Sequence, residues 1–127
     1  MYRATIENRG DSKYYATTRH NSFVIDTEGQ GANPVDTLLA SLCGCMGHQT
    51  RDYMRDQGIV CNGFSVTAEA EPTDDKTRLS DIKVCIDLKD TRLDKQRKSE
   101  LLKYVERCMI HGTLKSNSAI HVSLNGA

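Results

Sequence analysis

The chain has 127 residues, the size of one domain, so we expect a single domain over residues 1–127. Its 17 basic residues balance its 17 acidic residues, and this balance excludes a charged surface of one sign that would attract nucleic acid or anionic lipid. Hydrophobic residues make up only 38% of the chain, which is low for a compact monomer and favours an oligomer.

Nothing in the sequence indicates a membrane partner or a secretory signal. Residues 1–20 are polar, and the longest apolar run, Leu38 to Met46, is far shorter than the roughly 20 residues that cross a bilayer. We therefore expect a cytoplasmic protein, in which five cysteines are normally reduced. Their odd number and irregular spacing argue against a disulfide scaffold.

The first third of the chain is typical of β structure. Apolar and polar residues alternate from residue 2 to 7, and further strands are predicted over 13–18 and 23–25. Turn residues at 8–11 and 20–22 separate the strands, which predicts an antiparallel meander. A loop, residues 29–32, follows.

A long helix is predicted next. Asn33 is a good N-cap, Pro34 suits the first helical position, and Asp36 suits the positive end of the helix dipole. We expect the helix to run to about Gln57 and to end at Gly58. Its first half is apolar on nearly every face, which predicts burial on all sides.

The remaining elements complete an α+β pattern. Alternation predicts a hairpin of two strands over 64–71 and 82–88, and helical spacing predicts a helix over 94–107. A short helical turn over 109–115 and a last strand over 120–124 follow. The order βββ–α–ββ–α–α–β groups the strands in runs, which indicates the α+β class.

Cys45 is the first candidate for chemistry. It lies about three turns into the long helix, too far from the N-terminus for the dipole to activate it, so a nearby cation or hydrogen-bond donor is needed. Gly44 and Gly47 flank it, each at a cost of about 1 kcal/mol relative to alanine. That cost is explained if a partner helix or a substrate approaches closely. The alternative is a small buried cysteine without a chemical role.

Each of the other cysteines also has either a structural or a chemical interpretation. Cys43 points about 200° away from Cys45 around the helix, so we interpret it as core packing. Cys61 and Cys85 are interpreted as structural. Cys108 ends the second helix and is either a thiol that resolves an oxidised Cys45 or a buried cysteine at a helix end.

Metal binding is a rival interpretation of the same residues. Cys43, Cys45, Cys108 and His111 supply the four ligands of a structural zinc site. Two cysteines one residue apart in a continuous helix diverge, however, so we expect no metal. A serine-hydrolase motif and a phosphate-binding loop are also absent from the sequence.

Two segments resemble the OsmC/Ohr family. The first is the run from Gly31 to Cys45, GANPVDTLLASLCGC, in which Asn-Pro opens a helix that leads to Gly-Cys. The second is the run from Cys108 to Leu114, CMIHGTL, which lacks the proline that usually follows the cysteine in that family. The order of the predicted elements is also similar to that fold, so the resemblance covers nearly the whole chain.

The resemblance implies an OsmC-like fold, with antiparallel sheets around a long central helix, in an intertwined homodimer with active sites at the interface. It implies reduction of organic hydroperoxides without a cofactor. Cys45 would become a sulfenic acid, and Cys108 would condense with it to a disulfide. A small thiol or a dihydrolipoyl group would then restore both thiols.

The chain departs from the family near the start of the helix. The peroxidase branch carries Glu directly after Asn-Pro, and this Glu orients an Arg from the N-terminal region. Here Val35 holds the Glu position and Asp36 follows, turned by about 100°. The resemblance therefore assigns the acid role to Asp36 and the cation role to Arg19, whose alternative is an ordinary surface residue.

Two other functions fit the same sequence. One is a non-catalytic module that holds a small apolar ligand or an electrophile, which the missing Glu favours. The other is a thiol redox sensor or stress-response scaffold, in which oxidation alters a partner interaction.

Overall fold

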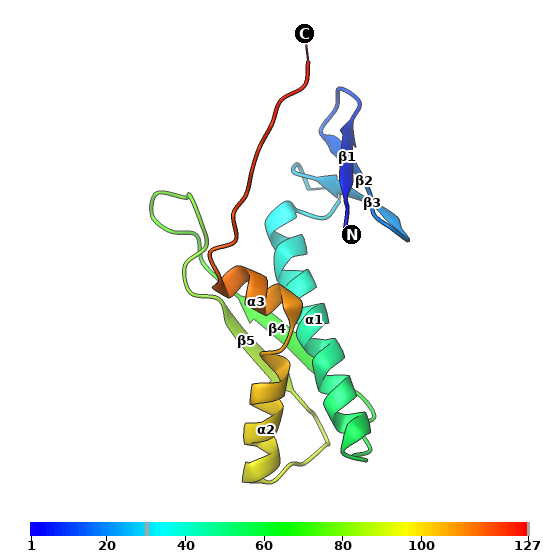
Figure 1. Cartoon of the computed structure of the whole chain (residues 1–127), viewed down its shortest axis with the longest axis vertical. Helices are drawn as coiled ribbons and strands as arrows, with labels where there is room; N and C mark the ends of the chain where they lie inside the picture. The colour runs from blue at the N-terminus through cyan, green and yellow to red at the C-terminus, as the bar shows by residue number, and fades with distance from the viewer. Residues whose placement is uncertain (30, 127) are drawn as a thin grey trace. The chain divides into compact units, whose positions relative to one another are not determined.

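The computed structural model describes residues 1–29 and 31–126. The chain forms two compact units, Met1–Ala40 and Ser41–Ala127. Figure 1 shows the order of elements as βββ–α–ββ–α–α, and both sheets are antiparallel, so the predicted α+β class is confirmed. In the described residues no helix is both long enough and apolar enough to cross a membrane.

The first unit contains a three-stranded meander. Strands β1 (Thr5–Asn8), β2 (Lys13–Thr17) and β3 (Ser22–Asp26) pair in sequence order and run antiparallel. Thr5 pairs with Thr17 across the first ladder, and Tyr14 pairs with Ile25 across the second. The meander predicted from alternation and turn residues is therefore confirmed.

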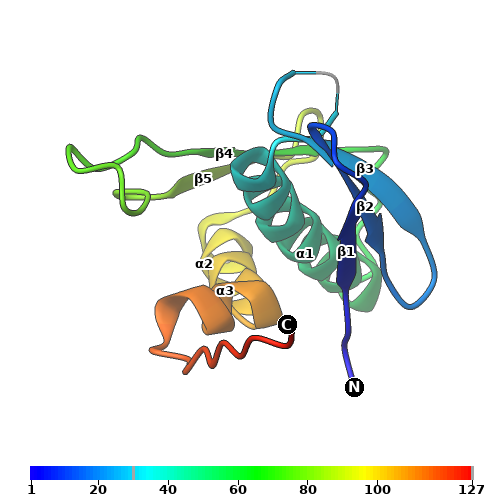
Figure 2. The same cartoon turned by 90° about the horizontal axis from the view of Figure 1, so that it is seen from above.

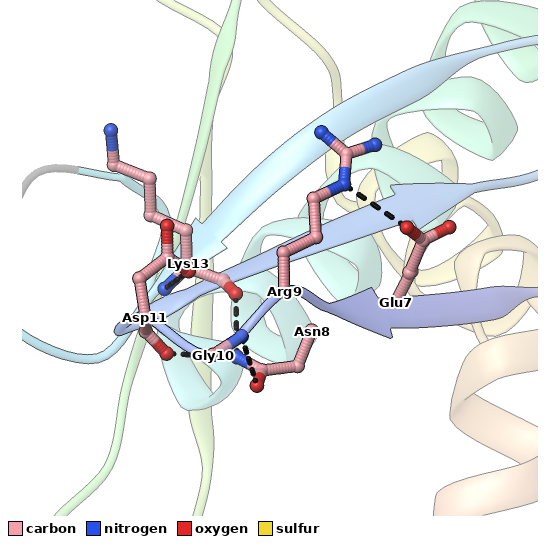
Figure 3. A network of polar contacts seen from close by, with 6 residues as sticks. All are labelled: Glu7, Asn8, Arg9, Gly10, Asp11 and Lys13. Carbon is pink, nitrogen blue, oxygen red and sulfur yellow. Dashed lines mark hydrogen bonds and ion pairs between the residues drawn. The ribbon is translucent and has the colours of Figure 1, made fainter.

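The turn between β1 and β2 is held by side chains that bond to the backbone (Figure 3). The Asn8 side-chain amide donates to the carbonyls of Asp11 and Lys13 at 2.8 and 3.0 Å, and its oxygen accepts from the Gly10 N–H at 3.1 Å. Gly10 has a φ of +91°, which side chains rarely adopt. These residue types explain why the turn was predictable.

The loop after β3 is tied back to that strand. The buried Asp26 carboxylate accepts from the Glu28 N–H at 2.9 Å, and the Asp26 N–H donates to the Ala32 carbonyl at 3.2 Å. A Cβ on Gly31 would lie 3.0 Å from the Val24 carbonyl oxygen, so glycine allows this close approach. Gln30, part of the predicted loop, lies outside the described residues.

Helix α1 (Pro34–Asp56) begins where the sequence predicts. The Asn33 side chain accepts from the Val35 N–H at 2.9 Å, and the Asn33 carbonyl accepts from the Thr37 N–H at 2.9 Å. The helix ends just before Gly58, whose φ of +65° stops further helical turns.

Burial of α1 differs from the prediction. We expected its first half to be buried on all sides, but Ala40, Ser41 and Gly44 are exposed in this chain. The buried residues follow a single stripe toward the C-terminal half: Leu42, Met46, Thr50, Tyr53 and Met54. The prediction was wrong because one chain supplies neighbours for one face of the helix only.

The second unit is built on the hairpin of β4 (Ser65–Glu69) and β5 (Lys83–Asp87). Val66 pairs with Ile86, and their side chains share the inward face, while the alternate residues are exposed. Figure 2 shows α1 and α2 on the same side of this hairpin.

Helices α2 (Lys95–Val105) and α3 (Met109–Lys115) complete this unit. The core gathers apolar residues from α1, from α2 and from the junctions beside them: Leu42, Met46, Tyr53, Met54, Leu93, Leu101, Val105 and Cys108. The buried Tyr53 hydroxyl donates to Glu100 at 2.9 Å, which fixes α2 against α1. Burial is the main cause that raises the pKa of Tyr53, and the hydrogen bond to the Glu100 carboxylate raises it further.

The predicted last strand is not formed. Residues 117–126 belong to no strand, and Ile120, Val122 and Leu124 are 87%, 91% and 93% exposed. The alternation is present in the sequence, but the described part of the chain offers this segment no strand to pair with. An isolated strand has no stability of its own.

The cap of α2 gives a test of this packing. The Asp94 carboxylate accepts from the Arg97 N–H at 2.8 Å at the start of the helix. Asp94→Ala should lower the free energy of unfolding by about 0.5–2 kcal/mol, measured by urea denaturation, because an N–H group of the helix loses its partner. Asp94→Asn should retain most of that stability, because the amide oxygen also accepts. Equal loss in both variants would contradict this role.

Candidate functional site

The structure brings the two cysteines of the predicted motifs together. Cys45 lies on α1 and packs against the core cluster that contains Cys108. A side-chain hydrogen bond joins the two thiols. Of the predicted site residues, Cys45 and Cys108 therefore form a pair, although they are 63 positions apart in the printed sequence (108 − 45).

Cys108 is held by the start of α3. It is the N-cap residue of that helix, and its Sγ accepts a hydrogen bond from the His111 N–H at 3.3 Å. The side chain is almost fully buried, with 1% of the residue exposed. The sulfur is therefore fixed between the backbone of α3 and the thiol of Cys45.

This environment raises the pKa of Cys108. Burial is the largest cause, since it disfavours the thiolate, and the hydrogen bond and the negative charge of Cys45 act in the same direction. The N–H groups of His111 and Ile110 oppose the rise because they stabilise a thiolate. Cys108 is thus kept as a thiol that can donate its hydrogen bond to Cys45.

Exposure distinguishes the two sulfurs. Cys45 is partly exposed, whereas Cys108 is buried. A small oxidant from solvent therefore meets Cys45 first, and the sulfur of Cys108 is already adjacent when Cys45 has reacted. A disulfide between the two cysteines requires this adjacency of their side chains.

The other cysteines lie apart from this pair. Cys43 is half-buried, and burial raises its pKa, while a backbone hydrogen bond at Ala68 on β4 lowers it. The Cys61 Sγ donates to the Gly63 carbonyl at 3.5 Å, and Cys61 packs against the core, as its predicted structural role requires. Cys85 is exposed on β5, and its predicted structural role stays a prediction.

A metal site does not form from the residues considered for zinc. Within residues 1–29 and 31–126, no group of three or more His, Cys, Asp or Glu side chains is arranged to hold a metal ion. Cys43 interacts with the backbone of Ala68 on β4, whereas Cys45 interacts with Cys108, whose sulfur accepts from the His111 N–H.

Arg19 and Asp36 belong to the first unit. The Arg19 guanidinium lies 4.3 Å from the centre of the Tyr2 ring and lines an open cavity of about 530 Å³ with Arg3 and His20. Asp36 is exposed in the first turn of α1. Among the residues that the structure describes, no ion pair joins Arg19 to Asp36. Their predicted roles stay predictions.

Sequence reasoning missed the groups that hold Cys108. The backbone N–H groups of Ile110 and His111 are aimed at its sulfur because Cys108 caps α3. The sequence held part of the evidence for this capping role, since a short helix was predicted to start directly after Cys108. A cysteine in the capping position can accept from the N–H groups of the first turn.

The fold and the site together define a class of protein: an α+β chain with a half-exposed cysteine on a long helix and a buried cysteine that contacts it. Residues 27–123 match the family model described as OsmC-like protein. The chain therefore belongs to the OsmC-like family, as the two cysteine motifs predicted. No curated protein has a sequence that matches this one significantly.

Solved structures from several organisms share this fold. An OsmC-like protein from Mycoplasma pneumoniae superposes with a TM-score of 0.78 at 19% identity, over 92% of this chain and 89% of that one. The organic hydroperoxide resistance protein OhrB of Bacillus subtilis gives 0.59 at 19% identity, over 92% of both chains. The organic hydroperoxide resistance protein OsmC from Legionella pneumophila gives 0.64 at 18%, over 92% and 90%.

The raised pKa of Cys108 can be tested by alkylation. Cys108 should react with iodoacetamide at least about tenfold more slowly than the exposed Cys85 at pH 8, because its thiolate is disfavoured and access is restricted. Its rate should go on rising at pH values above the usual thiol pKa. Peptide mass mapping over time measures both rates, and a Cys108 that reacts as fast as Cys85 at pH 8 would contradict the assignment.

Proposed function

We propose that this protein reduces organic hydroperoxides with Cys45 as the reacting thiol and Cys108 as the resolving thiol. The contact between the two sulfurs carries this proposal, because the reaction needs them adjacent. Membership in the OsmC-like family supports it, as do the printed names of two relatives of the same fold, which are organic hydroperoxide resistance proteins.

The reaction proceeds in two steps on the protein. The Cys45 thiol releases its proton, and the thiolate attacks the terminal oxygen of the peroxide. The O–O bond breaks, Cys45 becomes a sulfenic acid, and the alkoxide takes up a proton and leaves as the alcohol. The Cys108 sulfur then attacks the Cys45 sulfur, loses its proton and displaces water, so that a disulfide forms. The peroxide is the oxidant in the first step, and no cofactor takes part.

A thiol reductant returns the protein to its starting state. Either two molecules of a small thiol or the two thiols of one dihydrolipoyl group exchange with the Cys45–Cys108 disulfide, which restores both protein thiols while the reductant becomes a disulfide. The exposure of Cys45 makes its sulfur the accessible one for this attack. A reducing compartment such as the cytoplasm supplies such thiols.

Arg19 and Asp36 are proposed to activate Cys45. A guanidinium near the sulfur would favour the thiolate, and a carboxylate at the start of α1 would orient that guanidinium. The stacking of Arg19 on Tyr2 shows that its side chain takes up a defined position on an aromatic ring within the first unit. Asp36 stands in the first turn of α1, one residue after the position that the family fills with Glu.

We propose that the functional form is a homodimer. Three features of the single chain support a second copy: the low hydrophobic content, the exposed faces of the first half of α1, and the unpaired apolar segment with Ile120, Val122 and Leu124. A Cβ on Gly44 would meet no atom within 4 Å, so this glycine faces open space that a second α1 helix can fill.

Counting thiols after exposure to peroxide tests the mechanism. One equivalent of cumene hydroperoxide should remove two free thiols per chain. The peptides that carry Cys45 and Cys108 should then be joined by a disulfide, with a combined mass lower by two hydrogens. Cys108→Ser should stop at a sulfenic acid that dimedone captures on Cys45. Cys45→Ser should leave all remaining thiols intact.

Cys43→Ser serves as the control, because that cysteine lies on the same helix but contacts β4 instead of Cys108. It should react like the unmodified chain. Unchanged thiols on Cys45 and Cys108 after exposure would contradict the proposal and would favour a non-catalytic binding module.

The activating role of Arg19 has its own test. Arg19→Gln should slow the oxidation of Cys45 by organic hydroperoxide about tenfold to a hundredfold, since a cation that stabilises developing negative charge is removed. Asp36→Asn should cause a smaller loss of the same kind. Rates are measured by stopped flow with excess peroxide.

The matched control is Arg9→Gln, because Arg9 is an exposed arginine of the same unit that also stacks on a tyrosine, Tyr15. It should leave the rate unchanged. Equal rates in Arg19→Gln and Arg9→Gln would show that Arg19 is an ordinary surface residue.

A further inference from the structure

The short helix α3 begins at one sulfur of the cysteine pair. Cys108 is the N-cap residue of α3, and its Sγ accepts from the His111 N–H at 3.3 Å. A second backbone hydrogen bond reaches the same sulfur from Ile110. The N–H groups at the start of a helix have no partner within the helix, so a capping side chain supplies the acceptor. One sulfur therefore caps α3 and also forms the hydrogen bond with Cys45.

Beyond its first turn, α3 packs weakly against the rest of its unit. The helix has seven residues, and none of them is buried. Ile110 packs partly against the core, whereas residues 112–115 are exposed. Helices this short are unstable by themselves, and Gly112 lowers the helix propensity further. The stability of α3 therefore depends on its first turn, where the Cys108 cap lies.

The chain that follows α3 does not anchor the helix either. The Ser116 N–H donates to the Gly112 carbonyl at 3.1 Å and closes the last turn. Residues 117–126 then form neither a helix nor a strand, and their side chains are exposed (Figure 1). A segment with few buried contacts opens locally at a small cost in free energy. A change at the first turn can therefore unfold α3 without unfolding the core.

We propose that the Cys45–Cys108 disulfide removes the cap of α3 and unfolds this helix, so that α3 is folded only while both thiols are reduced. This inference rests on the proposed function, in which the peroxide is the oxidant. The S–H bonds of both cysteines and the O–O bond of the peroxide break, one S–S bond forms, and an alcohol and water leave. Reduction of the disulfide by a thiol restores the cap.

Two changes at Cys108 remove the cap. In the reduced chain the sulfur contacts both the Cys45 thiol and the His111 N–H. A covalent bond holds the sulfur closer to Cys45 than a hydrogen bond does, so its position relative to the N–H groups of α3 changes. A disulfide sulfur also cannot ionise, whereas the N–H groups of His111 and Ile110 favour the thiolate. The folding of α3 thus depends on the oxidation state of the pair.

Hydrogen exchange followed by mass spectrometry compares α3 in the two oxidation states. Diamide oxidises the full chain by taking two hydrogens from two thiols, which reduces it to a hydrazine, and peptide mapping verifies the Cys45–Cys108 disulfide. Peptides over residues 109–116 should exchange at least about threefold faster in the oxidised chain, because the uncapped helix opens more often. Exchange in α2 should stay unchanged, because the opening is local.

Two substitutions at Cys108 separate the loss of the cap from the formation of the disulfide. Cys108→Ser cannot form the disulfide, but a serine hydroxyl is a good N-cap acceptor, so α3 should exchange slowly with and without diamide. Cys108→Ala removes the cap without oxidation, so α3 should exchange fast even in the reduced chain. Cys43→Ser serves as the control, because Cys43 contacts β4 instead of α3, and it should behave like the unmodified chain.

The outcomes separate this inference from the peroxide chemistry. Unchanged exchange in α3 despite a verified Cys45–Cys108 disulfide would overturn the inference and leave the proposed function intact. Faster exchange in Cys108→Ser after diamide would overturn the inference as well, because no disulfide at residue 108 can cause it. A chain in which diamide forms no disulfide between Cys45 and Cys108 would contradict both the inference and the proposed function.

Discussion

The contact between the thiols of Cys45 and Cys108 is the interaction on which the proposed chemistry depends. The core of the second unit creates it, because α1 carries one sulfur and the junction of α2 and α3 carries the other. Burial keeps Cys108 protonated, while N–H groups of α3 fix the position of its sulfur. Half-exposure leaves Cys45 open to solvent. The two thiols thus differ in their access to solvent before any oxidant arrives.

Much of this arrangement could be predicted from local signals in the sequence. Asn33 and Gly58 marked the ends of α1 because capping depends on residues within one turn of the helix. Alternation predicted both sheets, since a strand with one buried face repeats every two residues. The pairing of Cys45 with Cys108 was implied by the resemblance of two motifs to one family, and in the structure the two residues lie in contact.

The features that could not be predicted depend on partners distant in sequence or outside the chain. Apolar composition alone did not show that α1 packs on one face only, and alternation at Ile120 did not supply a strand to pair with. The outward position of Cys85 follows from the register of β5 against the core, which residue type does not show. The proposed roles of Arg19 and Asp36 also depend on contacts with residues distant in sequence, and the residues near them in sequence do not determine those contacts.

A reagent that bridges two neighbouring thiols tests the central claim most directly. Phenylarsine oxide binds tightly only where two sulfurs can reach one arsenic atom. The reduced chain should bind one equivalent under native conditions and should lose that binding in Cys45→Ser and in Cys108→Ser, but keep it in Cys43→Ser. Binding that survives the loss of Cys45 or Cys108, or no binding by the unmodified chain, would contradict the contact between these two thiols.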